Sequence, residues 1–200
     1  MEKACVLFSG GKDSCLVALM LSKFFEIELV TYNFGLLENY KKLEEIAKKL
    51  GFNFTVAKLD KEILSVAMEQ VIQDGFPNNG ITYIHKKAIE KVTENFKIIS
   101  DGVRRDDRVP VLSLAEIKSI EDRFDVHYIQ PLMGYSRRTV NLLVERFFEI
   151  KEYKSSSGFI GAEYEFELKE IIKNKYGEEK IQEIFPSEHT HTIVLKLKNK

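Results

Sequence analysis

The sequence predicts an α/β protein built on a doubly wound, mostly parallel sheet of five strands. Short apolar and β-branched runs alternate along the chain with segments whose apolar residues recur at the i, i+3, i+4 spacing of a helix. Strands that alternate with helices form βαβ units, and such units give a parallel sheet covered by helices on both faces. A C-terminal α/β extension follows the fifth predicted strand.

Each predicted element has its own local signal. The apolar run near the N-terminus stops at Gly10 and Gly11, the second predicted helix stops at Gly51, and Ser113 stands three residues before Glu116 as in a capping box. We expect strands at residues 3–8, 26–34, 52–59, 96–100 and 126–131, and helices at residues 14–25, 37–50, 63–72, 78–95, after Ser113, and at residues 136–148.

The last fifty residues form a separate predicted unit. We expect residues 1–150 to form the main α/β domain and residues 151–200 to form the extension. Within the extension, residues 161–176 have the pattern of a strongly amphipathic helix and residues 190–198 alternate like an edge strand. The extension packs either on the main sheet or on a second copy of the chain, so a homodimer is one expectation.

Composition and charge exclude several classes of protein. With 44% hydrophobic and 30% charged residues the chain is neither disordered nor collagen-like, and a net charge of −1 excludes a strongly basic coat for nucleic acid. No apolar run approaches the ~18 residues of a membrane span, and the N-terminus lacks a signal-peptide pattern. Two cysteines are too few for a disulfide framework or a four-thiolate metal site. These features predict a cytoplasmic protein with no membrane segment.

The arginines are unevenly distributed. All seven lie between Arg104 and Arg146, whereas lysines occur throughout the chain. The planar guanidinium group suits phosphate and carboxylate partners. The cluster therefore indicates either a surface for an anionic acceptor or a network of structural ion pairs.

The segment after the first predicted strand carries the strongest functional signal. It lies where a strand is followed by a helix, at the carboxyl edge of a parallel sheet, where α/β folds bind ligands. Two glycines allow a tight turn with exposed backbone amides, and the helix adds the positive end of its dipole, so the segment suits an anion. An aspartate beside a polyanion indicates an intervening cation, such as the magnesium of a nucleotide complex. The segment consists of Ser9, Gly10, Gly11, Lys12, Asp13 and Ser14.

Two common phosphate-binding patterns do not fit this segment. A Walker A loop needs Ser or Thr directly after the lysine, where this chain has Asp13, and a glycine at the position of Val6. The G-x-G-x-x-G fingerprint is also missing. A tight turn that caps a helix, without a ligand, is the structural alternative.

The string SGGKDS after a first strand resembles the pyrophosphate loop (PP-loop), SGGxDS, of the N-type ATP pyrophosphatases in the adenine nucleotide alpha hydrolase-like superfamily. The resemblance extends to about residue 150. It implies a Rossmann-like fold of the HUP type, with ATP and Mg²⁺ bound by residues 1–150. It also implies adenylation of an acceptor oxygen, with pyrophosphate released and AMP then displaced by a nitrogen or sulfur nucleophile.

The resemblance assigns functions to individual residues. The loop would hold the pyrophosphate part of ATP, adenine would lie at the end of the second strand, and an acidic segment would follow the fourth strand. That segment departs from the family pattern GHxxDD in its spacing, and no histidine follows its glycine. The implied nucleotide-binding residues are Ser9, Gly10, Gly11, Lys12, Asp13, Ser14, Tyr32, Asn33, Phe34, Asp101 and Gly102. The implied metal ligands are Asp13, Asp106 and Asp107, and the implied catalytic residues are Lys12, Asp13, Arg105, Asp106 and Asp107.

The sequence leaves the acceptor open between tRNA, a small molecule and a protein side chain. Cys5 and Cys15 cannot supply the three cysteines of the iron–sulfur thiolation enzymes in this family, which favours amide or amine formation. The alternative function is a non-catalytic sensor or regulatory subunit that binds ATP or AMP. Asp13 and the Asp106–Asp107 pair favour the enzyme, because a sensor needs fewer metal-binding carboxylates.

Overall fold

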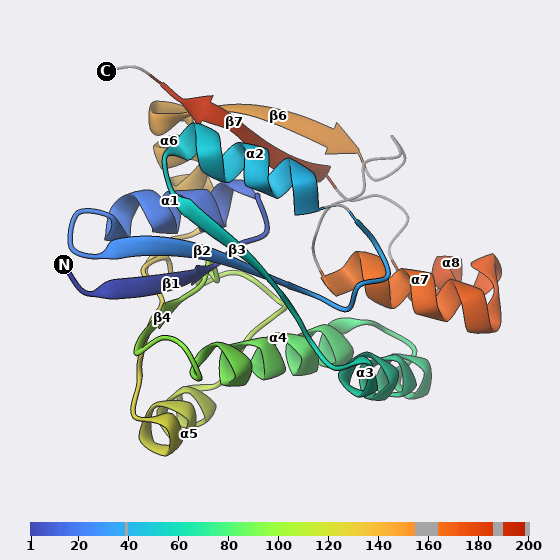
Figure 1. Cartoon of the computed structure of the whole chain (residues 1–200). Helices are drawn as coiled ribbons and strands as arrows, with labels where there is room; N and C mark the ends of the chain where they lie inside the picture. Colours follow the sequence, from blue (N-terminus) through green and yellow to red (C-terminus); the bar gives the residue numbers. More distant parts are fainter. Residues whose placement is uncertain (39, 155–163, 186–189, 199–200) are drawn as a thin grey trace.

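The computed structural model describes residues 1–38, 40–154, 164–185 and 190–198 of the chain. Its main body is a five-stranded parallel sheet in the order β3-β2-β1-β4-β5, with helices on both faces (Figure 1). The predicted doubly wound α/β fold is therefore confirmed. In the described part of the chain, no helix is both long and apolar enough to cross a membrane.

The elements follow the predicted alternation. The strands of the main sheet are β1 (Lys3–Leu7), β2 (Glu26–Asn33), β3 (Asn53–Lys58), β4 (Ile98–Ser100) and β5 (His127–Ile129). The helices are α1 (Lys12–Leu21), α2 (Tyr40–Leu50), α3 (Lys61–Asp74), α4 (Asn78–Val92), α5 (Leu114–Phe124), α6 (Arg137–Phe147), α7 (Tyr164–Tyr176) and α8 (Glu178–Ile184). Two more strands, β6 (Phe148–Lys154) and β7 (Thr190–Leu197), lie outside the main sheet.

The central strand β1 separates two hydrophobic cores. Ala4 and Val6 pack in the core that includes residues of α1, α2 and α6, whereas Cys5 and Leu7 pack in the core that includes residues of α3, α4 and α5. Successive strand residues point to opposite faces, so a strand covered on both faces is apolar throughout. This explains why a short unbroken apolar run, rather than an alternating one, encodes β1.

The chain order in the sheet reverses at β1. The chain runs from β1 outward to β2 and β3, then returns to the other side of β1 for β4 and β5. At such a switch point the connections leave the sheet in opposite directions and open a crevice at the carboxyl ends of the strands. The loop after β1 and the loop after β4 both border this crevice.

Helices α3 and α4 pack unusually closely on one side of the sheet. A Cβ added at Gly80 of α4 would lie 2.8 Å from the Ala67 carbonyl oxygen and 2.5 Å from a methyl group of Val71, both in α3. Only a glycine leaves room for this approach. Helix α4 is thereby held directly against α3.

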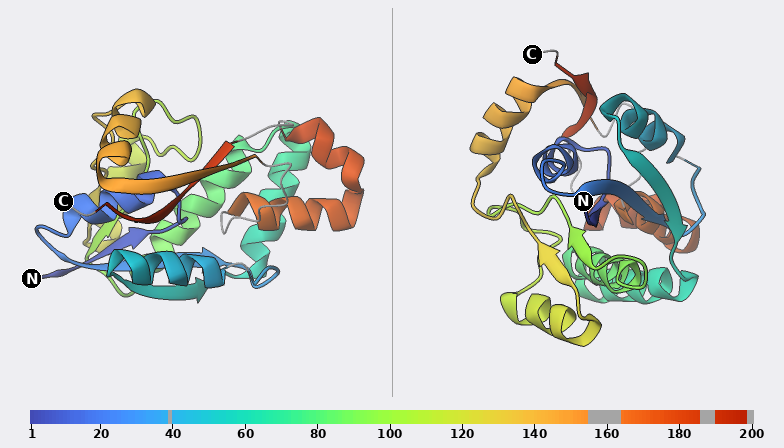
Figure 2. Two further views of the ribbon diagram at one scale, coloured as in Figure 1. Left: turned by 90° about the horizontal axis from the view of Figure 1, so that it is seen from above. Right: turned by 60° about the vertical axis from the view of Figure 1, so that its left-hand side comes forward.

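The C-terminal part differs from the expectation in how its strand pairs. Strand β7 pairs antiparallel with β6, which the sequence did not predict, and the two form a separate sheet rather than an edge of the main one. Figure 2 shows this β6–β7 pair beside α1 and α2, and β7 contacts both helices. Residues 161–163 of the predicted amphipathic helix lie outside the described residues.

Helix α7 packs on the face of the main sheet opposite to the β6–β7 pair. It contacts β2, α3 and α4, and its Leu168 and Ile172 are fully buried in the core beneath these elements. Within the described chain, the C-terminal part thus packs on both faces of the main body. The division into two domains at residue 150 stays a prediction.

Candidate functional site

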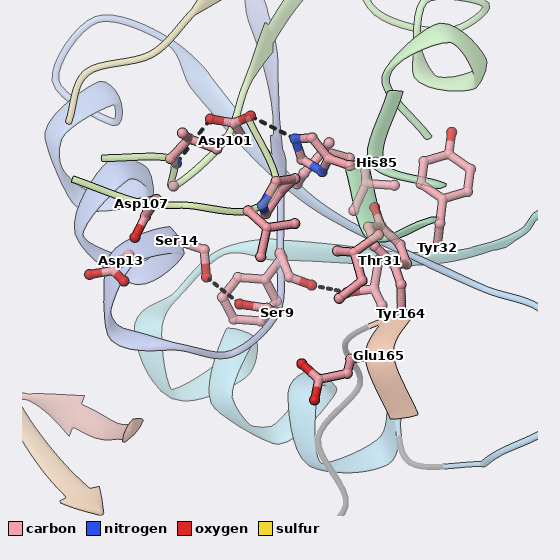
Figure 3. Close-up of a pocket in the computed structure, with 18 residues that line it drawn as sticks. Ser9, Asp13, Ser14, Thr31, Tyr32, His85, Asp101, Asp107, Tyr164 and Glu165 are labelled. Carbon is pink, nitrogen blue, oxygen red and sulfur yellow. Dashed lines mark hydrogen bonds and ion pairs between the residues drawn. The ribbon is translucent and has the colours of Figure 1, made fainter. Parts of the chain in front are cut away.

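A cavity of about 280 Å³ opens at the carboxyl ends of β1, β2 and β4. It lies at the switch point of the sheet and is close to the lower end of the roughly 300–1,000 Å³ typical of small-molecule sites. Figure 3 shows loop residues on one side and Tyr164 on the other. The predicted site residues that line this cavity are Ser9, Asp13, Ser14, Tyr32, Asp101, Gly102 and Asp107.

The loop after β1 positions hydroxyl and amide groups at the start of α1. The Gly11 N–H donates to Ser9 Oγ at 3.3 Å, and Ser14 Oγ donates to the Gly11 carbonyl oxygen at 3.1 Å. Gly11 is the N-cap residue and no side chain caps the helix. The N–H groups of the first turn and the positive end of the helix dipole are therefore suited to an anionic ligand.

Two glycines allow close approaches around this loop. Gly10 has φ +74°, and a Cβ there would lie 2.4 Å from Leu43 Cδ2 of α2. A Cβ at Gly102 would lie 2.9 Å from Ser14 N, so the loop after β4 packs directly against the first turn of α1. The predicted roles of these residues in binding depend on this backbone packing.

Strand β7 also contacts the loop. Gly11 and Ile193 form an isolated antiparallel bridge. Lys12 does not line the main cavity but a second one of about 50 Å³, together with Arg137, Glu152 and Thr192. The β6–β7 pair therefore supports the loop after β1, the candidate phosphate-binding loop, from its outer side.

An arginine connects the three predicted metal ligands. Arg104 Nη1 lies 3.3 Å from Asp13 Oδ2 and Arg104 Nε lies 3.5 Å from Asp106 Oδ1, while Arg104 Nη2 forms a close ion pair with Asp107. Asp106 lies outside the main cavity and accepts the backbone N–H of Arg137 at 2.8 Å, at the start of α6. The structure therefore separates Asp107, which lines the cavity, from its neighbour Asp106, which is exposed.

Asp13 has the properties expected of a group that meets a cation. Burial raises the pKa of Asp13, although the positive charges of Lys12 and Arg104 oppose this shift. Its Oδ1 is buried and has no hydrogen-bond partner among the described residues. The described residues contain no group of three or more His, Cys, Asp or Glu side chains that could hold a metal alone. Mg²⁺ is commonly bound by one or two carboxylates plus substrate phosphates, so Asp13 and Asp107 fit such an ion.

Asp101 lies in a buried hydrogen-bond network at the edge of the cavity. Its carboxylate accepts from His85 Nε2 at 2.8 Å, from the Tyr128 hydroxyl, and from the Val103 N–H at 3.0 Å. Burial alone would raise the pKa of Asp101, but these hydrogen bonds outweigh it and lower the pKa. Asp101 therefore fixes the loop that carries Gly102, and its oxygens are largely occupied by protein donors.

The remaining predicted residues lie near the cavity without lining it. Asn33 and Phe34 are buried at the end of β2, and Arg105 is exposed in the loop after β4. The expected ion pairs are confirmed for part of the arginine segment, and the surface for an anionic acceptor stays a prediction. Arg104 and Arg123 form ion pairs with carboxylates, whereas Arg105, Arg108, Arg137 and Arg138 are exposed.

The cavity residues that were not predicted from the sequence include three from the separate helices α4 and α7. His85 comes from α4, while Tyr164 and Glu165 come from the start of α7. The ring centroids of His85 and Tyr164 lie 6.2 Å apart. The sequence contains no local motif that links these positions to the loop, because only the packing of α4 and α7 brings them there.

The chain matches known proteins over nearly its whole length. Residues 1–196 match the model of a family of unknown function, DUF7411. The chain belongs to this family. This DUF7411 protein is 43% identical over 194 residues to the uncharacterized protein MJ0690 of Methanocaldococcus jannaschii, covering 96% of this chain and 95% of the relative. A crystal structure of a predicted subunit of tRNA methyltransferase from Methanocaldococcus jannaschii has a TM-score of 0.91 at 40% identity, covering 100% of this chain and 99% of that one.

Other relatives resemble the DUF7411 protein over part of its length. The 7-cyano-7-deazaguanine synthase of Methanobrevibacter smithii is 38% identical over 61 residues, which cover 29% of this chain and 27% of the enzyme. That of Staphylococcus epidermidis is 37% identical over 90 residues, covering 38% and 40%. The U34-tRNA thiolase NcsA of Methanococcus maripaludis shares the fold, with a TM-score of 0.55 at 14% identity over 92% of this chain and 70% of that one. These matches support a relationship between this chain and the PP-loop superfamily.

Proposed function

We propose that this DUF7411 protein binds ATP with Mg²⁺ in the main cavity and adenylates an oxygen atom of an acceptor. The observation that carries the proposal is the uncapped N-terminus of α1, which borders the cavity together with Ser9, Asp13, Ser14 and Asp107. Partial similarity to 7-cyano-7-deazaguanine synthases supports the proposal, because those relatives are enzymes by name.

The loop residues would bind the phosphates. Backbone N–H groups of the first turn of α1 and the hydroxyls of Ser9 and Ser14 would donate hydrogen bonds to phosphate oxygens. Lys12 would add a positive charge at the outer side of the loop, where it lies 3.7 Å from Asp13 Oδ2. These contacts would hold the pyrophosphate part in place while the acceptor oxygen attacks the α-phosphorus.

Magnesium fits the acidic side of the cavity. Asp13 and Asp107 would hold the ion, which would neutralise charge on the departing pyrophosphate. Among the described residues, no lysine or arginine lines the cavity, and Arg104 pairs with both aspartates without lining it. A triphosphate placed beside these two carboxylates is stabilised by a cation on the cavity side. The acidic lining therefore favours a magnesium complex over free ATP.

The proposal leaves the identity of the acceptor open. Arg105 and Arg108 are exposed on the loop after β4, Arg137 and Arg138 are exposed at the start of α6, and all four suit an anionic acceptor such as tRNA. The relative described as a predicted subunit of tRNA methyltransferase favours tRNA and a protein partner. A small molecule or a protein side chain is the alternative acceptor.

The product profile from α-labelled ATP tests this function. The protein is incubated with Mg²⁺ and ammonium, with and without bulk tRNA, and with a small-molecule extract. AMP and pyrophosphate formed with only one fraction would identify the acceptor class. ATP binding without AMP in any mixture would indicate a non-catalytic sensor, and no binding would refute the proposal.

A matched pair of variants places the reaction in the cavity. Asp107→Asn removes a carboxylate that lines it, and we expect the rate of AMP formation to fall at least tenfold. Asp106→Asn makes the same chemical change one residue away, outside the cavity, and should reduce that rate less than threefold. Equal effects of the two changes would contradict the placement.

A further inference from the structure

The C-terminal helix α7 forms the side of the cavity that faces the loop after β1 (Figure 3). We propose that α7 is part of the nucleotide site: Tyr164 contacts the planar base of the bound nucleotide, and Glu167 is a positioning residue that holds the helix there. This inference rests on the proposed binding of ATP. It gives a function to a segment outside the PP-loop resemblance.

Glu167 attaches α7 to the end of β2. Its side chain is 3% exposed, Oε2 accepts the Phe34 N–H at 2.8 Å, and Oε1 accepts the Leu36 N–H at 2.9 Å. Both carboxylate oxygens therefore bind backbone donors that follow directly on a strand bordering the cavity. Charge-assisted hydrogen bonds of this kind are stronger than neutral ones. They fix both the rotation of α7 and its position along β2.

Tyr164 precedes Glu167 by three residues, so the two side chains lie on the same side of the helix, about one turn apart. The fixed rotation of α7 therefore also fixes where the Tyr164 ring points. Figure 3 shows that ring extending from α7 towards His85 and Thr31. Burial, and then the nearby Tyr32, raise the pKa of Tyr164, so its phenol stays neutral and can donate a hydrogen bond.

The surroundings of Tyr164 suit an uncharged planar group. Ile81, Val109 and Pro110 add apolar surface to the cavity, and the carboxylates of Asp13 and Asp107 lie on the side of the loop. Glu165 also lines the cavity beside Tyr164, but its carboxylate forms an ion pair with Lys169. The α7 side therefore suits a neutral base better than a phosphate. Aromatic side chains bind bases by stacking. Phosphates at the loop and the base at α7 would together fill the cavity.

Binding measurements on the whole chain separate the base from the phosphates. Mg²⁺–ATP and Mg²⁺–tripolyphosphate are compared by calorimetry for the wild type, Tyr164→Ala and Tyr164→Phe. We expect Tyr164→Ala to weaken ATP binding at least tenfold and tripolyphosphate binding less than twofold, with Tyr164→Phe within threefold of the wild type. Unchanged ATP affinity in Tyr164→Ala would overturn the inference and leave the proposed function intact. Equal weakening for both ligands would also overturn it, and failure of the wild type to bind ATP would overturn both proposals.

Amide hydrogen exchange tests the positioning role independently of any activity. Glu167→Gln replaces one oxygen by an NH₂ group, so one of the two backbone N–H groups loses its acceptor. We expect faster exchange at Phe34 or Leu36, together with at least threefold weaker ATP binding. The control is Glu170→Gln, because Glu170 lies on the same helix and, within the described part of the chain, accepts an exposed hydrogen bond from Asn174. Unchanged exchange in Glu167→Gln, or an equal loss of affinity in the control, would overturn the positioning role.

Discussion

Replacing Gly102 by alanine tests whether the loop after β4 must pack directly against the first turn of α1. The new Cβ would lie 2.9 Å from Ser14 N, 3.1 Å from the Asp13 carbonyl carbon and 3.3 Å from Asp13 Cβ. The first two of these are backbone atoms of a helix, which cannot rotate away. The φ angle of Gly102 is outside the left-handed region, so only the lack of space opposes the change.

The expected cost follows from the size of the overlap. Contacts of 2.9 and 3.1 Å are shorter than ordinary van der Waals separations, so the two segments must move apart by several tenths of an ångström. An extra methyl group forced into a packed region typically costs about 1–3 kcal/mol. The displaced first turn also carries the N–H groups proposed to bind phosphate. We therefore expect a loss of about 1–3 kcal/mol in the free energy of unfolding and about tenfold weaker ATP binding.

Urea unfolding and calorimetric titration with Mg²⁺–ATP measure the two effects. The matched control is Gly134→Ala, because a Cβ at Gly134 has no atom within 4 Å and the residue has no positive φ. A glycine-to-alanine change without a clash alters stability by less than about 1 kcal/mol, usually in the stabilising direction. If Gly102→Ala and Gly134→Ala give the same stability and the same affinity, the close approach does not constrain the site.

Three further changes test the packing of α3 against α4 and the carboxylates of Glu116 and Asp101. Gly80→Ala should lower the free energy of unfolding in urea by about 1–3 kcal/mol, because its Cβ would overlap the backbone of α3. A hydrogen bond from Lys86 contributes most to the low pKa of Glu116, about 2 against 4.5, so the wild type should lose stability as the pH falls from 4.5 to 2. Glu116→Gln should remove that pH dependence. The lost contribution to the free energy of unfolding should be less than about 1 kcal/mol, because the side chain is exposed. Tyr128→Phe removes a donor to Asp101, so the pKa of Asp101 should rise and acid unfolding, followed by circular dichroism, should begin at higher pH.

Each of these predictions has a contradicting result. Equal stability of Gly80→Ala and Gly134→Ala would refute the close helix approach. An identical slope of stability against pH in Glu116→Gln and the wild type would refute the role of that carboxylate. An unchanged or lower acid midpoint in Tyr128→Phe would show that the tyrosine does not stabilise ionised Asp101.

The main sheet could be predicted because each of its elements has a signal within its own sequence. Strand β1 is an unbroken apolar run, and the capping box predicted at Ser113 and Glu116 is present at the start of α5. Boundaries were less accurate. Helix α1 begins at Lys12 rather than at residue 14, because the loop residues themselves form its first turn.

The pairing of β6 with β7 could not be predicted from local sequence signals. Strand β6 follows α6 directly, at Phe148, with no glycine or proline to mark the change. Its partner β7 lies far away in the sequence, so the stabilising hydrogen bonds of β6 are absent from any local window. Pairing between distant segments, rather than propensity, determines this part of the fold.

The site was predictable where its residues carry a local signal or stand where the family resemblance places a function. The loop after β1 could be recognised because Ser9, Asp13 and Ser14 are neighbours in the sequence. Asp106 and Asp107 look equivalent in the sequence, yet only Asp107 lines the cavity. His85 and Tyr164 meet the loop only through the packing of separate helices, which no spacing rule describes.

The bridge between Gly11 and Ile193 has a consequence for the order of events during biosynthesis. The ribosome makes the loop after β1 among the first segments of the described chain. It makes β7, the strand that supports this loop, among the last. Domains generally fold as units, and contacts between distant segments form slowly. A nascent chain is therefore expected to complete the contacts of this loop only after β7 has been made, so a product that stops before β7 would retain the SGGKDS sequence without the Gly11–Ile193 bridge.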